Sequence, residues 1–252
     1  MERREFLKKC CATAPVLLAV AHVGSPQDTP QAPAKAPAYD PTKHYYGMAI
    51  DVAACIGCGR CAEACKTENK VPREPIFFRT WIERYVTRKD GETTVDSPNG
   101  GIDGFPALAD EKSIERAYYV PKLCNHCAEA PCVQVCPIGA TFTTRDGVVL
   151  VDDDYCMACS YCVEACPYGM RYINPTTHVA DKCTFCYHRV TRGLLPACVE
   201  VCPTNARIFG EVTRPNSPLT TFRRLGSLQV LKPDLNARPK VFYANLVDGE
   251  VR

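Results

Sequence analysis

The fold is decided by the stretch Cys55-Ile56-Gly57-Cys58-Gly59-Arg60-Cys61-Ala62-Glu63-Ala64-Cys65, because its cysteine spacing recurs three more times in the sequence. Two residues separate the first cysteine from the second and the second from the third, and three residues separate the third from the fourth. The recurrence makes most of the chain an internal repeat. A repeat constrains the architecture before any single helix or strand is considered.

The third copy repeats this spacing without change, and the second and fourth copies lengthen one interval. Four residues precede the third cysteine of the second copy, and eleven precede that of the fourth copy. Proline follows the last cysteine in each later copy, whereas Lys66 follows it in the first. Sixteen of the 18 cysteines belong to these copies, and Cys10 and Cys11 do not. In chain order the motifs are Cys55, Cys58, Cys61 and Cys65; Cys124, Cys127, Cys132 and Cys136; Cys156, Cys159, Cys162 and Cys166; and Cys183, Cys186, Cys198 and Cys202.

This spacing is typical of iron-sulfur clusters. Three cysteines in a tight loop point their sulfurs at successive irons of one 4Fe-4S cubane, and the backbone N–H groups of the loop face the cluster. The fourth cysteine ligates the neighbouring cluster in two-cluster ferredoxins, so two motifs hold an interlocked pair of cubanes. Four motifs therefore predict four 4Fe-4S clusters in two pairs, with all sixteen cysteines as metal ligands.

Two other uses of cysteine fit this pattern less well. Zinc sites place four ligands on one ion in two pairs, which is not a spacing of three cysteines, then one, then proline. A disulfide framework suits an exported chain, but 252 residues are far more than a domain that needs disulfides in place of a core. Iron-sulfur ligation is therefore the preferred interpretation.

The composition limits the class of protein and its partners. With 46% apolar and 23% charged residues, the chain is ordinary for a globular protein. Thirty Lys and Arg against 28 Asp and Glu argue against a broad basic surface for nucleic acid. No run reaches the roughly 18 to 20 uninterrupted apolar residues of a clear membrane span. We expect no nucleic-acid partner, and membrane contact only through a partner subunit.

Residues 1–21 are expected to be an export signal. The string Arg3-Arg4-Glu5-Phe6-Leu7-Lys8 resembles a twin-arginine signal, which is read by a pathway for folded proteins. An uncharged, mostly apolar run of 14 residues follows at 10–23, which is too short to span a bilayer comfortably. Cleavage is expected after Ala19-Val20-Ala21, with an uncleaved anchor as the alternative. Residues 22–44 are rich in Pro and Ala and predict an extended spacer.

Export and iron-sulfur ligation support each other. A chain that carries assembled clusters cannot cross a membrane unfolded without losing them, so it needs the route for folded proteins. The expected location is the periplasm, peripheral at the cytoplasmic membrane. Cys10 and Cys11 are assigned to the apolar part of the signal rather than to a cluster.

The four-cluster domain is expected over residues 45–210. Strand-like runs lie at 81–86 and 147–151, and a turn-rich insertion lies at 96–101. In the eleven-residue excursion of the fourth motif, Tyr187, His188 and Arg189 predict a short helix that covers its cluster.

Residues 211–252 form the expected C-terminal extension. This segment contains no cysteine and has a strand-like run at 241–243. The extension and the segment at 80–119 are candidates for partner contact, with plain surface loops as the alternative.

Spacing alone leaves the pairing of the motifs open. Nineteen residues, including the strand-like run at 147–151, separate the second motif from the third, which suits a ferredoxin pair. Sixteen residues separate the third motif from the fourth, so that pairing is compatible with the spacing as well.

The chain resembles the tetra-cluster iron-sulfur subunits of membrane-associated molybdopterin oxidoreductases. The resemblance rests on the four-motif set and on the strings LCNHC at 123–127, ADKCTFC at 180–186 and GLLPACVE at 193–200. These strings are most similar to the tetrathionate, arsenate and polysulfide reductase branch and to the subunit of formate-dependent nitrite reduction. The resemblance implies an α+β fold of two interlocked bacterial-ferredoxin-like double-cluster modules with loop insertions.

The resemblance also implies which cysteines share a cluster, because the family pairs the first motif with the fourth and the second with the third. The implied ligand sets of the first pair are Cys55, Cys58, Cys61 and Cys202, and Cys183, Cys186, Cys198 and Cys65. Those of the second pair are Cys124, Cys127, Cys132 and Cys166, and Cys156, Cys159, Cys162 and Cys136. The third motif is complete, so no three-iron cluster is expected.

The expected function is electron transfer without catalysis. Complete quartets leave no open coordination site, and no nucleophile-base pair, phosphate loop or dinucleotide fingerprint is present. The resemblance implies a relay between a molybdopterin catalytic subunit and a quinone-reactive integral membrane subunit in anaerobic respiration. A quinone-linked complex without molybdenum is the alternative. An enzyme with an open cluster and an iron-sulfur assembly protein are rivals, which the complete ligand set and the export signal respectively disfavour.

Two residues beside the expected ligands have open roles. Lys66 either raises the potential of a nearby cluster through its charge or faces solvent. His126 lies between two ligands whose quartet is already complete, so a loop or partner-contact role is expected rather than ligation.

The expected charge of the mature protein depends on the clusters. Loss of residues 1–21 removes four basic and two acidic residues and leaves 26 of each. Four oxidised cubanes at about −2 each would give the holoprotein a net charge of about −8.

Overall fold

The computed structural model describes residues 38–74, 77–247 and 251. The expected signal, with Cys10 and Cys11, and the spacer up to residue 37 lie outside the described residues. The compact unit begins at Tyr39, ahead of the expected start at residue 45. The Tyr39 hydroxyl donates to Asp146, and its ring stacks on His44 with 5.0 Å between ring centroids. No helix among the described residues is long and apolar enough to cross a membrane.

The unit combines short strands and short helices. The described strands are β1 (Tyr46–Asp51), β2 (Thr80–Arg88), β3 (Thr93–Asp96), β4 (Ile114–Leu123), β5 (Thr141–Thr143), β6 (Val149–Val151), β7 (Tyr172–Ile173), β8 (Ala180–Asp181), β9 (Arg207–Glu211), β10 (Leu228–Gln229) and β11 (Val241–Ala244). The described helices are α2 (Arg60–Asn69), α3 (Pro131–Gln134), α4 (Tyr161–Glu164), α5 (Tyr187–Val190), α6 (Ala197–Glu200), α7 (Pro218–Leu225) and the 3-10 turns η1 (Pro41–Lys43), η2 (Pro98–Gly101), η3 (Glu111–Ser113) and η4 (Pro233–Leu235). The expected α+β class is confirmed, and the interlocked arrangement of clusters stays a prediction.

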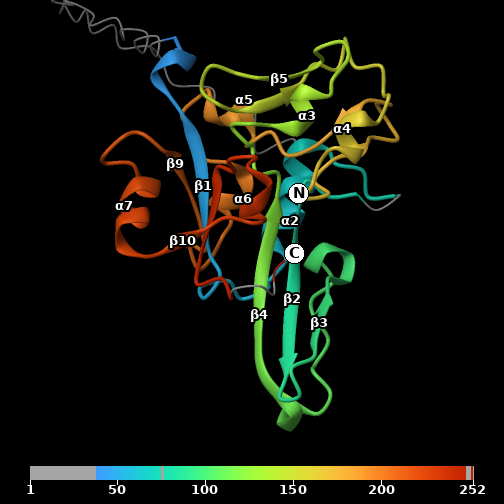
Figure 1. The fold of residues 1–252 in the computed structure, drawn as a ribbon, viewed down its shortest axis with the longest axis vertical. Helices are drawn as coiled ribbons and strands as arrows, with labels where there is room; N and C mark the ends of the chain where they lie inside the picture. The colour runs from blue at the N-terminus through green and yellow to red at the C-terminus, as the bar shows by residue number, and fades with distance from the viewer. Residues whose placement is uncertain (1–37, 75–76, 248–250, 252) are drawn as a thin grey trace, which may run out of the picture. The chain divides into compact units, whose positions relative to one another are not determined.

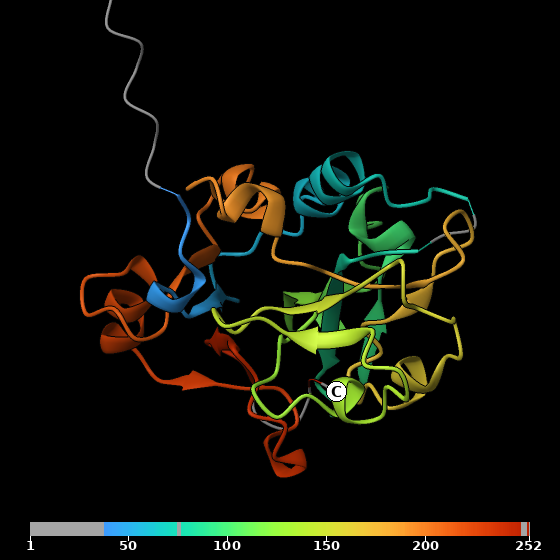
Figure 2. The same ribbon diagram turned by 90° about the horizontal axis from the view of Figure 1, so that it is seen from above.

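One sheet joins the start of the compact unit to its end. Its strand order is β10-β11-β1-β9, and β1 pairs in parallel with β11 and antiparallel with β9. Met48 and Ile50 of β1 and Val241 of β11 are fully buried, as strands in the middle of a packed sheet require. In both views α7 lies on the opposite side of β1 from β2 and β4 (Figure 1, Figure 2).

The expected extension at 211–252 shares this sheet with the expected domain at 45–210. Strand β9 spans the expected boundary between the two, and the strand expected at 241–243 is confirmed as β11. The segment is therefore continuous with the sheet at its start. Its contact with a partner stays a prediction.

A second sheet of order β3-β2-β4 starts beside α2. Strands β2 and β4 pair from Thr80 and Leu123 to Arg88 and Ile114, with a register shift between Thr87 and Arg88. Strand β2 confirms the run expected at 81–86, and η2 lies in the turn-rich insertion expected at 96–101. The two long strands run side by side away from α2 (Figure 1).

Two small hairpins connect the later motifs. β5 and β6 pair between the second and third motifs, and β7 and β8 pair between the third and fourth. Strand β6 confirms the later part of the run expected at 147–151. Helix α2 packs on α6, and α3 packs on α4. The helical parts of the first and fourth motifs are thus in contact, as are those of the second and third.

The four motif loops share one backbone feature that the sequence does not show. The residue before the second cysteine of each motif has a positive φ: 69° at Gly57, 43° at His126, 56° at Ala158 and 53° at Phe185. Three of these four residues carry a side chain that disfavours this conformation. The repeat of the cysteines is therefore matched by a repeat of loop shape.

Alanine at Gly59 is expected to destabilise the protein more than alanine at Gly139. Both glycines have positive φ, near +70°, where a side chain costs roughly 1–2 kcal/mol. A Cβ at Gly59 would clash with the carbonyl oxygen of Gly101, whereas a Cβ at Gly139 meets nothing within 4 Å. Anaerobic heating, followed by visible absorbance, measures both variants. Equal losses of thermal stability would show that the contact between the motif loop and Gly101 is unimportant.

Candidate iron-sulfur centres

The structure brings the sixteen motif cysteines together in four groups. Each group takes three cysteines from one motif and one from another, and all sixteen are free thiols. We name them quartet I (Cys55, Cys58, Cys61 and Cys202), quartet II (Cys65, Cys183, Cys186 and Cys198), quartet III (Cys124, Cys127, Cys132 and Cys166) and quartet IV (Cys136, Cys156, Cys159 and Cys162).

Three of the quartets line cavities of similar size. The empty space, open solvent included, is about 310 Å³ at quartet I, 290 Å³ at quartet II and 300 Å³ at quartet IV. Quartet III is recognised by the electrostatic influence of three of its thiols on the fourth. Burial raises the pKa of Cys127 to about 12, and the thiolates of Cys124, Cys132 and Cys166 add to that rise.

The thiols surround these spaces rather than meet at a point. Among the described residues, no group of three or more His, Cys, Asp or Glu side chains could hold a single metal ion. A zinc site draws four ligands to about 2.0–2.3 Å from one ion. A cavity with thiols on its walls fits a multinuclear cluster instead, so the geometry favours iron-sulfur ligation over zinc.

The quartets form a row in which the two ends reach the surface. Quartets II and III are neighbours, because the ring of His126, in the loop of quartet III, stacks on the ring of Phe185, in the loop of quartet II. Cys58 of quartet I and Cys159 of quartet IV are exposed, whereas every thiol of quartet II is buried. Ile56, which follows Cys55 of quartet I, and Met157, which follows Cys156 of quartet IV, are also exposed.

Buried thiols resist ionisation in the chain without metal. Burial is the main cause that raises the pKa of Cys55 and that of Cys198 to about 11. Ligation requires thiolates, so positive charge must compensate. Iron supplies that charge when a cluster is bound, and two buried arginines supply more. Arg171 Nε and Nη2 and Arg207 Nη1 have no hydrogen-bond partner among the described residues, as expected for donors that face absent acceptors.

Amide groups donate to several of the sulfurs. Backbone N–H groups reach Sγ of Cys136 at 3.4 Å, Cys166 at 3.5 Å, Cys156 at 3.4 Å and Cys183 at 3.4 Å. Asn69 Nδ2 lies 3.6 Å from Sγ of Cys65 and 3.6 Å from Sγ of Cys186. Hydrogen bonds to sulfur raise the potential of a cluster, so these amides belong to the site.

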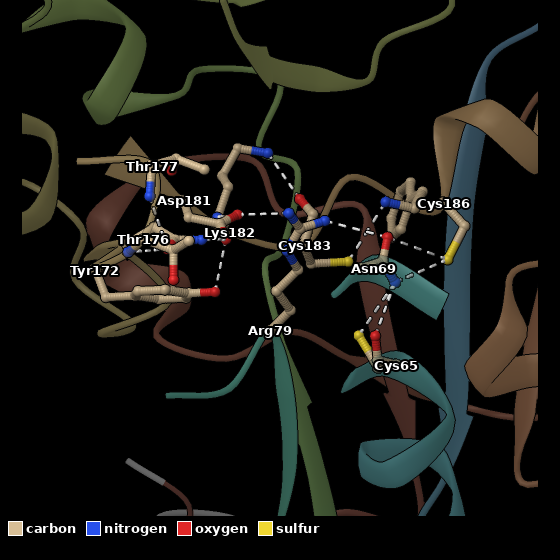
Figure 3. A network of polar contacts seen from close by, with 12 residues as sticks. Cys65, Asn69, Arg79, Tyr172, Thr176, Thr177, Asp181, Lys182, Cys183 and Cys186 are labelled. Atoms are coloured by element: carbon tan, nitrogen blue, oxygen red, sulfur yellow. Dashed lines mark hydrogen bonds and ion pairs between the residues drawn. The ribbon is translucent and has the colours of Figure 1, made fainter. Parts of the chain in front are cut away.

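A polar network supports quartet II from the side (Figure 3). Arg79 Nη1 donates to Asn69 Oδ1 at 3.1 Å, and Arg79 Nη2 pairs with Asp181 Oδ1 at 2.8 Å. The hydroxyl of Tyr172 donates to Asp181 Oδ2 at 2.7 Å. Asn69 is thus held in place to donate to the two sulfurs. Nothing in the local sequence pattern distinguishes these residues, because they come from α2, β7, β8 and the residue before β2.

Lys66 does not face solvent, so that alternative is wrong. The side chain is 4% exposed, and Nζ donates to the carbonyl oxygens of Pro72 at 3.0 Å and Phe77 at 2.6 Å. It also lies over the Phe78 ring, 4.1 Å from the centroid. The chain after α2 folds back over the ammonium group. The influence of Lys66 on a cluster potential stays a prediction.

His126 is a loop residue, as expected, but burial excludes contact with a partner. The side chain is 0% exposed, and Nδ1 accepts from the backbone N–H of Val149 at 3.1 Å. The ring stacks on Phe185 with 3.7 Å between centroids. Burial and nearby cations lower its pKa well below the ordinary value. Neutral His126 therefore ties the second motif to β6 and to the fourth motif.

The short helix expected in the fourth motif is confirmed as α5. His188 Nε2 lies 2.7 Å from Glu68 Oε1, and Arg189 Nη1 donates to Glu68 Oε2 at 2.9 Å. Arg189 also pairs with Glu200, and Tyr187 donates to Asp146 at 3.0 Å. The excursion between the motif cysteines therefore joins α2 to α6.

Family models and relatives match the part of the chain that carries the quartets. Two models, each described as a 4Fe-4S dicluster domain, match residues 54–140 and 115–212. A tetrathionate reductase subunit of Salmonella typhimurium is 42% identical over 83% of this chain and 76% of its own length. The chain belongs to the family of iron-sulfur subunits of reductase complexes.

Two further relatives confirm the resemblance seen in the sequence. A polypeptide of the polysulfide reductase of Wolinella succinogenes is 37% identical over 78% of this iron-sulfur subunit and 92% of its own length. The arsenate respiratory reductase iron-sulfur subunit ArrB of Shewanella sp. strain ANA-3 is 31% identical over 78% of this chain and 94% of its own. This iron-sulfur subunit is therefore an electron-transfer component of the reductase type.

Proposed function

We propose that this iron-sulfur subunit carries four 4Fe-4S clusters, one in each quartet, and relays electrons in anaerobic respiration. The observation that carries the proposal is the row of quartets with both ends at the surface. Each bound cluster would accept and release one electron at a time. Sixteen cysteines in complete quartets leave no coordination site for a substrate, so catalysis is assigned to another subunit.

The arrangement of the chain's own residues supports a relay. All four thiols of quartet II and three of the four thiols of quartet III are buried, which limits the access of water to the interior of the row. Cys58 and Cys159, at opposite ends of the row, are open to contact from outside the chain. Because electron tunnelling weakens steeply with distance, a partner can exchange electrons only where an end quartet reaches the surface. Two exposed ends therefore fit two partners.

The partners in this proposal are a molybdopterin catalytic subunit and a quinone-reactive integral membrane subunit. The names of the relatives support a complex of several subunits, because each is called one part of a reductase. The mature chain is placed in the periplasm, peripheral at the cytoplasmic membrane. The twin-arginine-like string at residues 3–8 supports export of the folded protein.

Anaerobic purification from the periplasmic fraction of native cells is expected to yield about sixteen irons and about sixteen acid-labile sulfides per chain. Molybdenum is expected in the complex that co-purifies with it. Zinc without sulfide would contradict the cluster assignment, and recovery only from the cytosol would contradict the location. An intact complex without molybdenum would favour a quinone-linked complex of another kind.

A further inference from the structure

The buried charges of the described residues are strongly unbalanced. Seven basic side chains are buried but only three acidic ones, namely Lys66, Arg84, Lys122, Arg171, Lys182, Arg207 and Lys240 against Asp146, Asp181 and Glu211. Burying a charge is costly unless an opposite charge or hydrogen bonds compensate. The excess of buried cations therefore needs compensation from groups other than buried carboxylates.

Arg207 lies between quartets I and II. Its Nη2 donates to Cys61 Sγ at 3.3 Å and to Thr80 Oγ1 at 2.8 Å. Burial lowers the pKa of Arg207, while the thiolates of Cys61, Cys198 and Cys55 raise it, and the net shift is upward. Cys61 and Cys55 belong to quartet I and Cys198 to quartet II, so one guanidinium serves both.

Arg171 occupies the corresponding place between quartets III and IV. Its Nη1 donates to Thr141 Oγ1 at 3.2 Å, and the side chain is 5% exposed. Burial lowers the pKa of Arg171, while the thiolates of Cys132, Cys124 and Cys162 raise it, and the net shift is again upward. The two arginines are also equivalent in sequence, because each is the fifth residue after the last cysteine of its motif.

Lys182 lies between the two interior quartets. Its Nζ donates to the carbonyl oxygen of Cys183 at 2.8 Å (Figure 3). Nζ also donates to the carbonyl oxygen of Val149, and the residue is 1% exposed. The thiolates that act on Lys182 are Cys124 and Cys132 of quartet III and Cys183 of quartet II; burial is the larger influence and lowers its pKa in the chain without metal.

None of these three cations forms an ion pair with a carboxylate in the part of the chain that the structure describes, and other buried cations do. Arg84 pairs with Asp96 at 2.6 Å, and Lys122 pairs with Glu83 at 3.5 Å. Lys240 also lacks a carboxylate within ion-pair distance among the described residues, but the thiolates that act on it, Cys127 and Cys124, both belong to quartet III. Only Arg207, Lys182 and Arg171 combine the lack of a carboxylate with thiolates from two quartets.

We propose that Arg207, Lys182 and Arg171 are counter-charges, one at each contact between successive quartets, which raise the potentials of the two clusters that each cation separates. The inference rests on the proposed function, because it needs a cluster in each quartet. Two neighbouring clusters of about −2 each repel an added electron. A fixed cation between them reduces that repulsion for both, and net charge is one of the main determinants of cluster potential.

The test is a potentiometric EPR titration of the holoprotein and of charge-removing variants. Arg207→Met is expected to make two of the four midpoint potentials more negative, and Arg171→Met is expected to move the other two. Lys182→Met is expected to move one member of each pair. The expected size is at least about tenfold in the ratio of reduced to oxidised cluster, equal to about 59 mV for a one-electron couple. This pattern needs no prior assignment of a signal to a quartet.

Two controls separate charge from packing. Arg84→Met removes a buried arginine that is paired with Asp96 and that has no motif thiolate among the groups that shift its pKa, so all four potentials are expected to stay unchanged. Arg207→Lys and Arg171→Lys keep the positive charge, so their midpoint potentials are expected to stay close to those of the wild type. If a methionine variant binds less iron, full iron content in the matching lysine variant supports the charge role.

The inference fails if all four potentials move together, if none moves, or if the lysine and methionine variants lose iron equally. These outcomes are distinct from failure of the proposed function. If the wild type holds about sixteen irons and neither Arg207→Met nor Arg171→Met changes a midpoint potential, only the counter-charge role is overturned. A wild-type chain without iron and sulfide would overturn both.

Discussion

Replacing Cys198 by alanine is expected to cost the protein more than a single cluster. Cys198 belongs to quartet II, whose four thiols are all buried around a space of about 290 Å³. Without its cluster this buried site would have no filling, and an unfilled interior cavity destabilises a protein in proportion to its volume. A typical domain is stable by only about 5–15 kcal/mol. Loss of this interior cluster would also leave Arg207 and Lys182 with one neighbouring cluster each instead of two.

The measurement is iron and sulfide content with thermal stability, and the matched control is Cys159→Ala. Cys159 is exposed and belongs to quartet IV at the end of the row. The control is expected to keep about twelve irons, those of the three remaining clusters, and to stay folded. Cys198→Ala is expected to hold fewer than about twelve irons or to fail to accumulate. Equal iron content and stability in the two variants would contradict the interior position of quartet II.

Asp181→Asn is expected to be the most destabilising change outside the cysteines. Its carboxylate accepts from Arg79 at 2.8 Å, from Tyr172 at 2.7 Å and from Asn174 at 3.1 Å. The side chains of Asp181 and Arg79 are 9% and 16% exposed. Breaking a buried pair costs about 3–5 kcal/mol, because it leaves one charge uncompensated. Asn69, which Arg79 holds against two sulfurs of quartet II, would lose its support as well.

Anaerobic heating of the holoprotein measures the loss. At about 2–4 °C per kcal/mol for a chain of this length, the temperature at which cluster absorbance disappears is expected to fall by about 10 °C. The control is Glu63→Gln, which breaks the exposed pair of Glu63 and Arg73. Exposed pairs contribute about 0–1 kcal/mol, so this variant should remain near the wild type. A small effect at both positions would show that the network in Figure 3 is not needed for stability.

The parts of the site that depend on the spacing of nearby residues could be predicted from the sequence. The cysteine spacings predicted the iron-sulfur motifs, which two 4Fe-4S dicluster family models match. The strands at β2 and β11 and the helix α5 also follow from short runs of suitable residues. The spacing of the cysteines could not decide whether the third motif pairs with the second or with the fourth. That choice depends on which helices pack, and packing of α3 on α4 is a tertiary contact.

The residues that the sequence left open are charged or polar and owe their roles to distant segments. The sequence left open whether Lys66 faces solvent or a cluster, and the fold shows that the carbonyls of Pro72 and Phe77 accept from its ammonium group. His126 is buried by Phe185, which lies far along the polypeptide. Arg171 and Arg207 could have been singled out by their shared offset from a motif cysteine. Their burial without a carboxylate partner among the described residues becomes visible only in the fold.

The parallel pairing of β1 with β11 bears on the order in which the protein is made. Strand β1 leaves the ribosome well before Val241 and its neighbours, with which it pairs. Quartet I likewise waits for Cys202. Quartets III and IV are complete once Cys166 has been synthesised, and their hairpin and helices lie within the same stretch of polypeptide. Maturation should therefore begin with quartets III and IV, and the pairing of β1 with β11 should close last.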